Sequence, residues 1–251
     1  MDKTKDIENR IREQANRAYN EGRYVFTDFM GIAELAVYYR IKNELSFVDS
    51  KVFGGTEFCE RGIIRFGSEK MFGYDEEYPI VLLSIEPVQK KFADKLTHRD
   101  FLGSVIGLGL ERDKLGDIFI QESTGYIFVM DSIAEYIENT LTYVKHTKIR
   151  VKRCESLPEN VGPKLAEKNI LVSSNRIDAI VSKVYGISRE ESLTLFRDGN
   201  IYLNGVEMTS NAKSLSPDDI VSVRGYGRFI FKELSGLTRK NKQNIIVEVY
   251  I

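Results

Sequence analysis

The chain has 251 residues, of which 42% are hydrophobic and 29% are charged, and its formal net charge at pH 7 is -1. This length and composition suit one large or two to three small globular domains, and they exclude a disordered or collagen-like chain. No apolar run reaches membrane-spanning length and the amino terminus has no signal-peptide core, so we expect a cytoplasmic protein without a membrane partner.

The residues that usually hold metals and cofactors are scarce. Cys59 and Cys154 lie far apart and the chain has two histidines, which excludes the ligand spacing of a zinc site and favours a reducing compartment. Neither a phosphate-binding loop nor a dinucleotide glycine fingerprint occurs. We therefore expect no metal and no cofactor.

The first domain, residues 1–74, is predicted to combine helices and strands from its apolar spacing and its glycine breaks. The predicted elements are helices over 6–20 and from a cap at Thr27 or Asp28 to about residue 43, and strands over 47–53 and 62–66. These residues indicate a small α+β domain and no particular chemistry.

The second domain, residues 75–168, has a more legible pattern. Its predicted elements are a strand over 80–86, a helix over 98–108 capped by Thr97, strands over 117–121 and 125–130, a helix over 131–144 and a strand over 148–154. The order βαββαβ is the ferredoxin-like plan, which RNA-recognition domains share.

Strand alternation places apolar side chains of this sheet toward the helices and a set of aromatic and basic side chains on the opposite face. Tyr126, Phe128 and Arg150 belong to that opposite face. Aromatic rings contribute about 1–3 kcal/mol per stacked base in single-stranded RNA binding. The alternative, equally weighted, is that this face packs against the first domain.

His98 begins the first helix of this domain, next to Arg99 and Asp100. A catalytic base needs a partner that orients it, and none is evident in the sequence. A structural or RNA-positioning role is therefore favoured over catalysis.

The third domain, residues 169–251, begins with two predicted amphipathic helices. The first has its buried face at Ile177, Ile180, Val181 and Val184, with Ser173 or Ser174 as its cap. In the second, Ser188 and Glu191 form a capping-box pattern.

Strands follow the two helices. Asn204-Gly205 accepts positive φ at both positions and predicts a tight hairpin. Basic side chains project from these elements, and together with two polar residues they are the candidate RNA contacts: Arg176, Lys183, Ser188, Arg189, Arg197, Asn204, Arg224 and Arg228. Such cations can release counterions from phosphates. Composition alone favours the alternative that these are ordinary solvated arginines.

These residues resemble a known module. The runs Arg176-Ile177-Asp178, Ser188-Arg189 and Gly199 to Gly205 are similar to the RNA-binding domain of small-subunit ribosomal protein four, the S-four domain. The chain departs from that pattern at Glu190 and Glu191, which reduce the local positive charge. The resemblance implies an αα-hairpin followed by β-strands.

The stretch from Leu96 to Leu110, with Arg112, Lys114 and 116–118 after it, resembles the YlmH family of bacterial proteins. The resemblance covers nearly the whole chain and implies three domains, the last of S-four type. It implies binding to ribosomal RNA and the large ribosomal subunit, with transfer RNA as a further partner. The implied role is quality control of stalled peptidyl-tRNA complexes.

We therefore expect an α+β protein of three small domains that binds RNA, acts without catalysis and is a monomer. Two alternatives stay open. One is an RNA-modifying enzyme, of pseudouridine synthase or ribosomal RNA methyltransferase type, although the expected catalytic and cofactor motifs are missing. The other is a scaffold in cell division, which only the family's genomic association suggests.

Overall fold

The computed structural model describes residues 3–159, 161–238 and 242–251. The chain divides into two compact units, Met1–Gly162 and Pro163–Ile251. The chain combines helices with small sheets in several segments, which confirms the predicted α+β class. No helix among the described residues is long and apolar enough to cross a membrane.

The amino-terminal part of the first unit packs helices on a three-stranded sheet of order β1-β3-β2. Its elements are α1 (Lys3–Glu21), β1 (Val25–Phe26), α2 (Ile32–Ile41), η1 (Lys42–Leu45), β2 (Ser50–Phe53), β3 (Ile63–Phe66) and α3 (Glu69–Phe72). Ile11, Ala15 and Ala18 of α1 are fully buried, so the predicted first helix and its apolar face are confirmed.

The second helix starts later than predicted. Thr27 donates its N–H to the Ile64 carbonyl at 3.0 Å, and Met30 donates to the Gly62 carbonyl at 2.8 Å. These hydrogen bonds hold residues 27–30 extended beside β3, so neither Thr27 nor Asp28 can cap a helix. The cap is Gly31, whose N–H donates to the Glu34 carboxylate at 2.9 Å.

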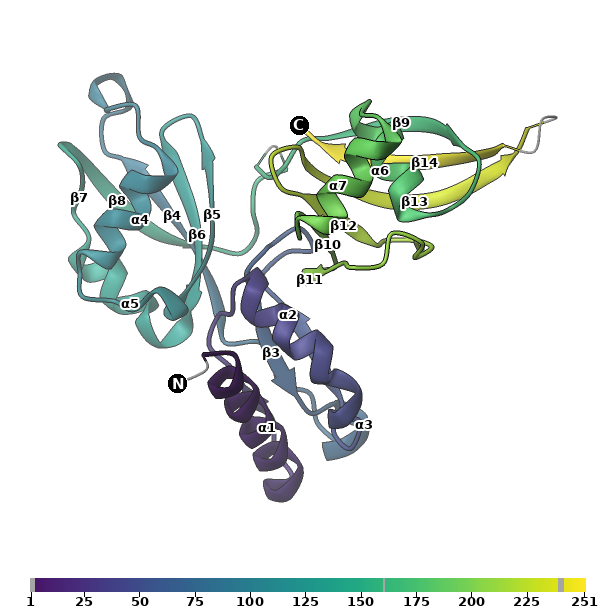
Figure 1. The fold of residues 1–251 in the computed structure, drawn as a ribbon. Helices are drawn as coiled ribbons and strands as arrows, with labels where there is room; N and C mark the ends of the chain where they lie inside the picture. The colour runs from purple at the N-terminus through teal and green to yellow at the C-terminus, as the bar shows by residue number, and fades with distance from the viewer. Residues whose placement is uncertain (1–2, 160, 239–241) are drawn as a thin grey trace. The chain divides into compact units, whose positions relative to one another are not determined.

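The middle part of the first unit is a five-stranded sheet of order β5-β6-β4-β8-β7, with α4 and α5 on one face (Figure 1). Its elements are β4 (Ile80–Pro87), η2 (Lys90–Phe92), α4 (His98–Ile106), η3 (Arg112–Lys114), β5 (Leu115–Gln121), β6 (Thr124–Met130), α5 (Asp131–Thr140), β7 (Tyr143–Val144) and β8 (Thr147–Cys154). The predicted βαββαβ order is confirmed. The second helix ends at Thr140, short of the predicted 144, because Tyr143 and Val144 pair with β8 instead.

The two faces of this sheet have different partners. Leu83, Ile85 and Ile127 are fully buried under the helices, as the alternation predicted. On the other face, Leu82 and Phe128 form one apolar cluster with Phe29 and Ile63 of the amino-terminal part. The sheet face that the sequence offered either to RNA or to the first domain therefore packs against the first domain.

The second unit is a six-stranded antiparallel sheet of order β11-β10-β12-β13-β14-β9, with two helices on one face (Figure 1). Its elements are β9 (Leu165–Val172), α6 (Ile177–Tyr185), α7 (Arg189–Arg197), β10 (Ile201–Leu203), β11 (Val206–Glu207), β12 (Ile220–Val223), β13 (Gly227–Leu237) and β14 (Gln243–Tyr250). The predicted helix pair is confirmed, and so is the hairpin at Asn204-Gly205, whose φ angles are +50° and +81°.

The cap of α6 differs from the prediction. Its N-cap is Arg176, and neither Ser173 nor Ser174 takes that position. Ile177 instead donates its N–H to the Lys213 carbonyl at 2.9 Å, and Asp178 donates to the Asn211 carbonyl at 3.4 Å. A loop that lies about 35 residues later in the chain thus satisfies N–H groups that a serine would otherwise cap.

Strand β9 crosses the predicted boundary between residues 168 and 169. It pairs with β14 along its whole length, from Leu165 opposite Tyr250 to Val172 opposite Gln243. The predicted boundary at residue 74 falls inside the first compact unit. The division into three domains stays a prediction about folding units.

Candidate nucleic-acid interface

The start of α6 holds a buried carboxylate between two arginines. Asp178 has only 1% of its side chain exposed, and it accepts hydrogen bonds from Arg176 Nε and Nη2, both at 3.0 Å. Arg189 Nη2, from the start of α7, reaches the same carboxylate at 3.4 Å. Both guanidinium groups remain open to water, with 36% and 57% of the side chains exposed. Asp178 thus neutralises part of their charge and fixes their place.

Ser188 caps α7 as predicted, and its Oγ accepts the Glu191 N–H at 3.0 Å. The Glu191 carboxylate accepts the Tyr226 hydroxyl at 2.7 Å. This bond ties the start of α7 to the turn between β12 and β13, and it is the first cause of a raised Tyr226 pKa. The Glu191 carboxylate is therefore hydrogen-bonded to Tyr226 on one side of α7.

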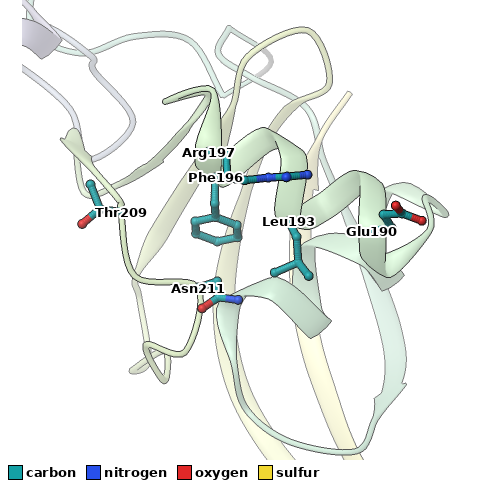
Figure 2. Close-up of a pocket in the computed structure, with 6 residues that line it drawn as sticks. All are labelled: Glu190, Leu193, Phe196, Arg197, Thr209 and Asn211. Carbon is teal, nitrogen blue, oxygen red and sulfur yellow. The ribbon is translucent and has the colours of Figure 1, made fainter.

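An open pocket of about 580 Å³ lies along the other side of α7. Its lining residues are Glu190, Leu193, Phe196, Arg197, Thr209 and Asn211. Figure 2 shows Leu193 and Phe196 pointing toward the loop that carries Asn211. Arg197 is exposed, and its Nη2 donates to Thr194 Oγ1 at 2.8 Å. The pocket therefore offers an apolar floor beside a cation.

The turn that follows β12 adds a further cation. Arg224 is exposed, and its main-chain N–H donates to the Asn200 carbonyl just beyond α7 at 2.9 Å. Arg176 and Arg189 thus lie at the start of α7, and Arg197 and the main chain of Arg224 lie at its end. We call these four residues the α7 surface. The loop that caps α6 brings the exposed Lys213 to the same end as Arg176, because Ile177 bonds to the Lys213 carbonyl.

Other candidate residues of the second unit lie outside the α7 surface. Asn204 is at the hairpin turn, where its side-chain amide bonds Asp219 and accepts the Ile220 N–H, each at 2.8 Å. Arg228 lies over the Tyr250 ring at 4.9 Å. Lys183 is exposed on α6. Asn204 thus shapes the hairpin, and the two cations belong to other parts of the surface.

Phe128 cannot serve as a stacking platform in this structure. It is 4% exposed and packs between the two sheets of the first unit. Gly55, with φ of +109°, allows this approach, because a Cβ there would lie 2.4 Å from the Phe128 ring. Tyr126 packs at the edge of the same cluster, where burial raises its pKa. Of the three middle-domain candidates, Arg150 alone is exposed.

Two further arginines hold the parts of the first unit together. Arg61 donates to the Phe29 carbonyl at 2.9 Å and to the Leu115 carbonyl at 2.8 Å. Arg112 donates to the same Leu115 carbonyl at 2.6 Å. Burial lowers the pKa of both guanidinium groups. These cations are bonded to main-chain oxygens between the two sheets, which removes them as candidates for RNA.

No group of three or more His, Cys, Asp or Glu side chains in the described part of the chain could hold a metal ion. Burial raises the pKa of the Cys59 thiol to about 11, so it stays protonated at neutral pH. His98 is exposed at the first position of α4.

Comparisons with known proteins found a matching family, a relative and a similar solved structure. Residues 74–157 match the family described as "Putative RNA-binding domain in YlmH". Over 230 residues the chain is 25% identical to "Ribosome-associated protein quality control protein P2" of Bacillus subtilis (strain 168), covering 90% of this chain and 87% of that protein. A solved structure, "Cell division protein ylmH from Streptococcus pneumoniae", is similar with a TM-score of 0.49 and 18% identity, over 61% of this chain and 92% of the other.

Proposed function

This chain belongs to the YlmH family, and from that membership we propose that it binds RNA of the large ribosomal subunit in quality control of stalled translation. The RNA-binding family that matches the middle of the chain supports RNA as the partner. The name of the Bacillus subtilis relative supports the ribosome as the place of action. Transfer RNA held on the stalled subunit is a further contact, and the protein works in the cytoplasm as a monomer.

The α7 surface is the observation that carries this proposal. Its exposed guanidinium groups come from two helices and a turn, and the structure holds two of them in place through Asp178. Guanidinium groups bind phosphate with two parallel hydrogen bonds, and each neutralised phosphate releases condensed counterions. The helix pair and hairpin also support an S-four type of module for residues 163–251. The protein acts by binding, with no bond made or broken.

Co-sedimentation with purified large subunits tests the proposal. We expect Arg197→Gln/Arg224→Gln to weaken association. The slope of log K, where K is the association constant, against log salt concentration should also become shallower by about 0.9 for each phosphate that is no longer neutralised. Neither side chain pairs with a carboxylate among the described residues, so the variant should keep its stability. Arg17→Gln/Arg23→Gln, on exposed arginines around the first helix, is the matched control. Undiminished association of the α7-surface variant at every salt concentration would overturn the assignment.

The variant Arg176→Gln/Arg189→Gln tests the second half of the same surface. It leaves Asp178 buried without its cations, so its folding is checked by circular dichroism before binding is measured. A folded variant that still sediments with large subunits as the parent does would also overturn the assignment.

Ribosomal RNA chemistry separates this proposal from an RNA-modifying enzyme. We expect the same modified nucleosides in ribosomal RNA from cells with and without the protein, measured by mass spectrometry. A modification that disappears with the protein would contradict a function by binding alone.

A further inference from the structure

A phenylalanine ring is exposed at one edge of the first unit. Phe92 ends the short helix η2, which connects β4 to α4, and 76% of it is exposed to solvent. Val88, four residues earlier, is 46% exposed. Burying a phenylalanine side chain stabilises a protein by about 1.5–3 kcal/mol, and an exposed ring does not make that contribution. The ring and the side chain of Val88 together leave apolar surface that a partner could cover.

The loop that carries Phe92 is attached to the sheet at both ends. Val88 donates its N–H to the Lys148 carbonyl of β8 at 3.0 Å. Asp94 donates its N–H to Thr147 Oγ1 at 2.9 Å, and that hydroxyl donates to the Asp94 carboxylate at 3.0 Å. Leu96 then anchors the chain in the core with 3% exposed. The ring is therefore presented from a held loop, which lowers the entropy cost of binding through it.

Several cations lie on the same loop and on the elements next to it. The exposed ones on the loop, on the first turn of α4 and at the start of β8 are Lys90, Lys91, Lys95, Arg99 and Lys148. We call them, together with Phe92, the basic edge. Lys91 Nζ lies 5.9 Å from the centre of the Phe92 ring.

The acidic groups near this edge already have partners. Asp94 bonds Thr147, and Asp100 bonds Thr97 and Lys145. Glu122 lies 3.9 Å from Lys90. The five cations of the basic edge outnumber these three carboxylates, and Asp100 already pairs with Lys145, so the edge keeps an excess of positive charge. The middle third of the sequence as a whole carries a small net negative charge.

We propose that the basic edge binds an unpaired segment of RNA, with one base stacked on Phe92 and neighbouring phosphates on the lysines. This inference rests on the proposed RNA-binding function and adds a second contact, distinct from the α7 surface. Single-stranded RNA supplies both partners that the edge lacks, because every base has a flat π face and every nucleotide carries a phosphate. An acidic protein segment would satisfy the lysines and leave the ring without a stacking partner.

The ring is tested first, with fluorescence anisotropy of the full chain on short labelled oligouridylate and oligoadenylate. We expect Phe92→Ala to raise Kd by about 5- to 150-fold, the range for removal of one stacked base. Phe92→Trp should retain binding. Tyr19→Ala is the control, since Tyr19 is 56% exposed on α1. Equal affinity of Phe92→Ala and parent, or an equal loss in Tyr19→Ala, would overturn the proposal.

The charges are tested by the salt dependence of the same binding. Lys90→Gln/Lys91→Gln should lower the slope of log K against log salt by about 1.4, since each phosphate of single-stranded RNA that a lysine neutralises contributes about 0.7. The control Lys5→Gln/Lys70→Gln removes two exposed lysines elsewhere in the first unit and should leave the slope unchanged. A slope equal to that of the parent in the Lys90/Lys91 variant contradicts phosphate binding at this edge.

Failure of this inference is distinguishable from failure of the proposed function. Arg197→Gln/Arg224→Gln should lose its association with large subunits and keep its affinity for oligonucleotides. Phe92→Ala should lose its affinity for oligonucleotides. If the α7-surface variant loses both large-subunit association and oligonucleotide affinity while Phe92→Ala keeps both, the proposed function stands and the proposal for the basic edge is wrong. A photo-reactive phenylalanine analogue at position 92 identifies the occupant on large subunits. We expect RNA adducts, and adducts with protein alone would overturn the proposal.

Discussion

Among single residues, Asp178 shows most clearly how folding and the proposed RNA binding share the same atoms. Its carboxylate is buried at 1% exposure, and it bonds two arginines that still face water. It also accepts the Ala179 N–H at 2.9 Å, at the positive end of α6. A proposed RNA-binding cation and a structural anion are thus joined, so we expect a change at either one to affect both stability and RNA affinity.

Replacing Asp178 by asparagine keeps the side-chain shape and removes the charge. We expect Asp178→Asn to lower the free energy of unfolding by about 1.5–3 kcal/mol, because hydrogen bonds to charged groups contribute that much. Urea denaturation followed by circular dichroism measures the change. Asp218→Asn is the control, since Asp218 is exposed and pairs with Lys232 at the surface. Equal urea midpoints for Asp178→Asn and the parent would contradict the account.

Ser188 was a candidate RNA contact in the sequence and is a helix cap in the structure. Removal of its hydroxyl leaves the Glu191 N–H without its acceptor. Ser188→Ala should therefore cost about 1 kcal/mol of stability, and Ser188→Gly only a few tenths. Measurements of urea stability and RNA affinity on the same protein separate the two roles. A loss of affinity without a loss of stability would make Ser188 an RNA contact.

Among the elements, helices α6 and α7 and the Asn204-Gly205 hairpin were predictable, because apolar spacing, a serine cap and a turn dipeptide act within a few residues. The start of α2 was not, since the β3 strand holds residues 27–30 extended. The position of Lys213 could not be predicted from the sequence either, because a loop distant in sequence caps α6. Phe128 has the same local pattern as a stacking aromatic, and only the packing of the two sheets decides its role.

Helix α4 offers a test by pH. Hydrogen bonds from Thr97, then the Lys145 ammonium 3.0 Å away, lower the Asp100 pKa from its ordinary value to about 2. A depressed carboxyl pKa contributes stability that is present above its unfolded value and is lost as pH falls through the folded one. We expect the melting temperature to fall between pH of about 4 and about 2, and Asp100→Asn to reduce that fall. An identical pH profile in this variant would contradict the capping role.

In the whole molecule, the two compact units have separate cores. Sixteen buried residues from Ile170 to Val247 form the core of the second unit, and all belong to residues 163–251. Strand β9 contributes Ile170 and Val172 to that core and covers the edge of β14. The second unit should therefore fold alone only if it includes β9.

Two fragments test this expectation. Residues 163–251 should unfold cooperatively in urea, whereas residues 173–251, which lack β9, should lose stability and aggregate through the exposed edge of β14. Circular dichroism and light scattering give the comparison. Equal stability of the two fragments would contradict the role of β9, and failure of the longer fragment to fold would contradict the separate cores.

We propose that the α7 surface holds this protein on ribosomal RNA of the large subunit. Cross-linking the protein to RNA in cells, followed by sequencing of the RNA and identification of the attached peptides, tests it most directly. We expect fragments of large-subunit ribosomal RNA attached near Arg176, Arg189, Arg197 or Arg224. Fragments drawn from messenger RNA, or attachment that leaves residues 163–251 untouched, would contradict it.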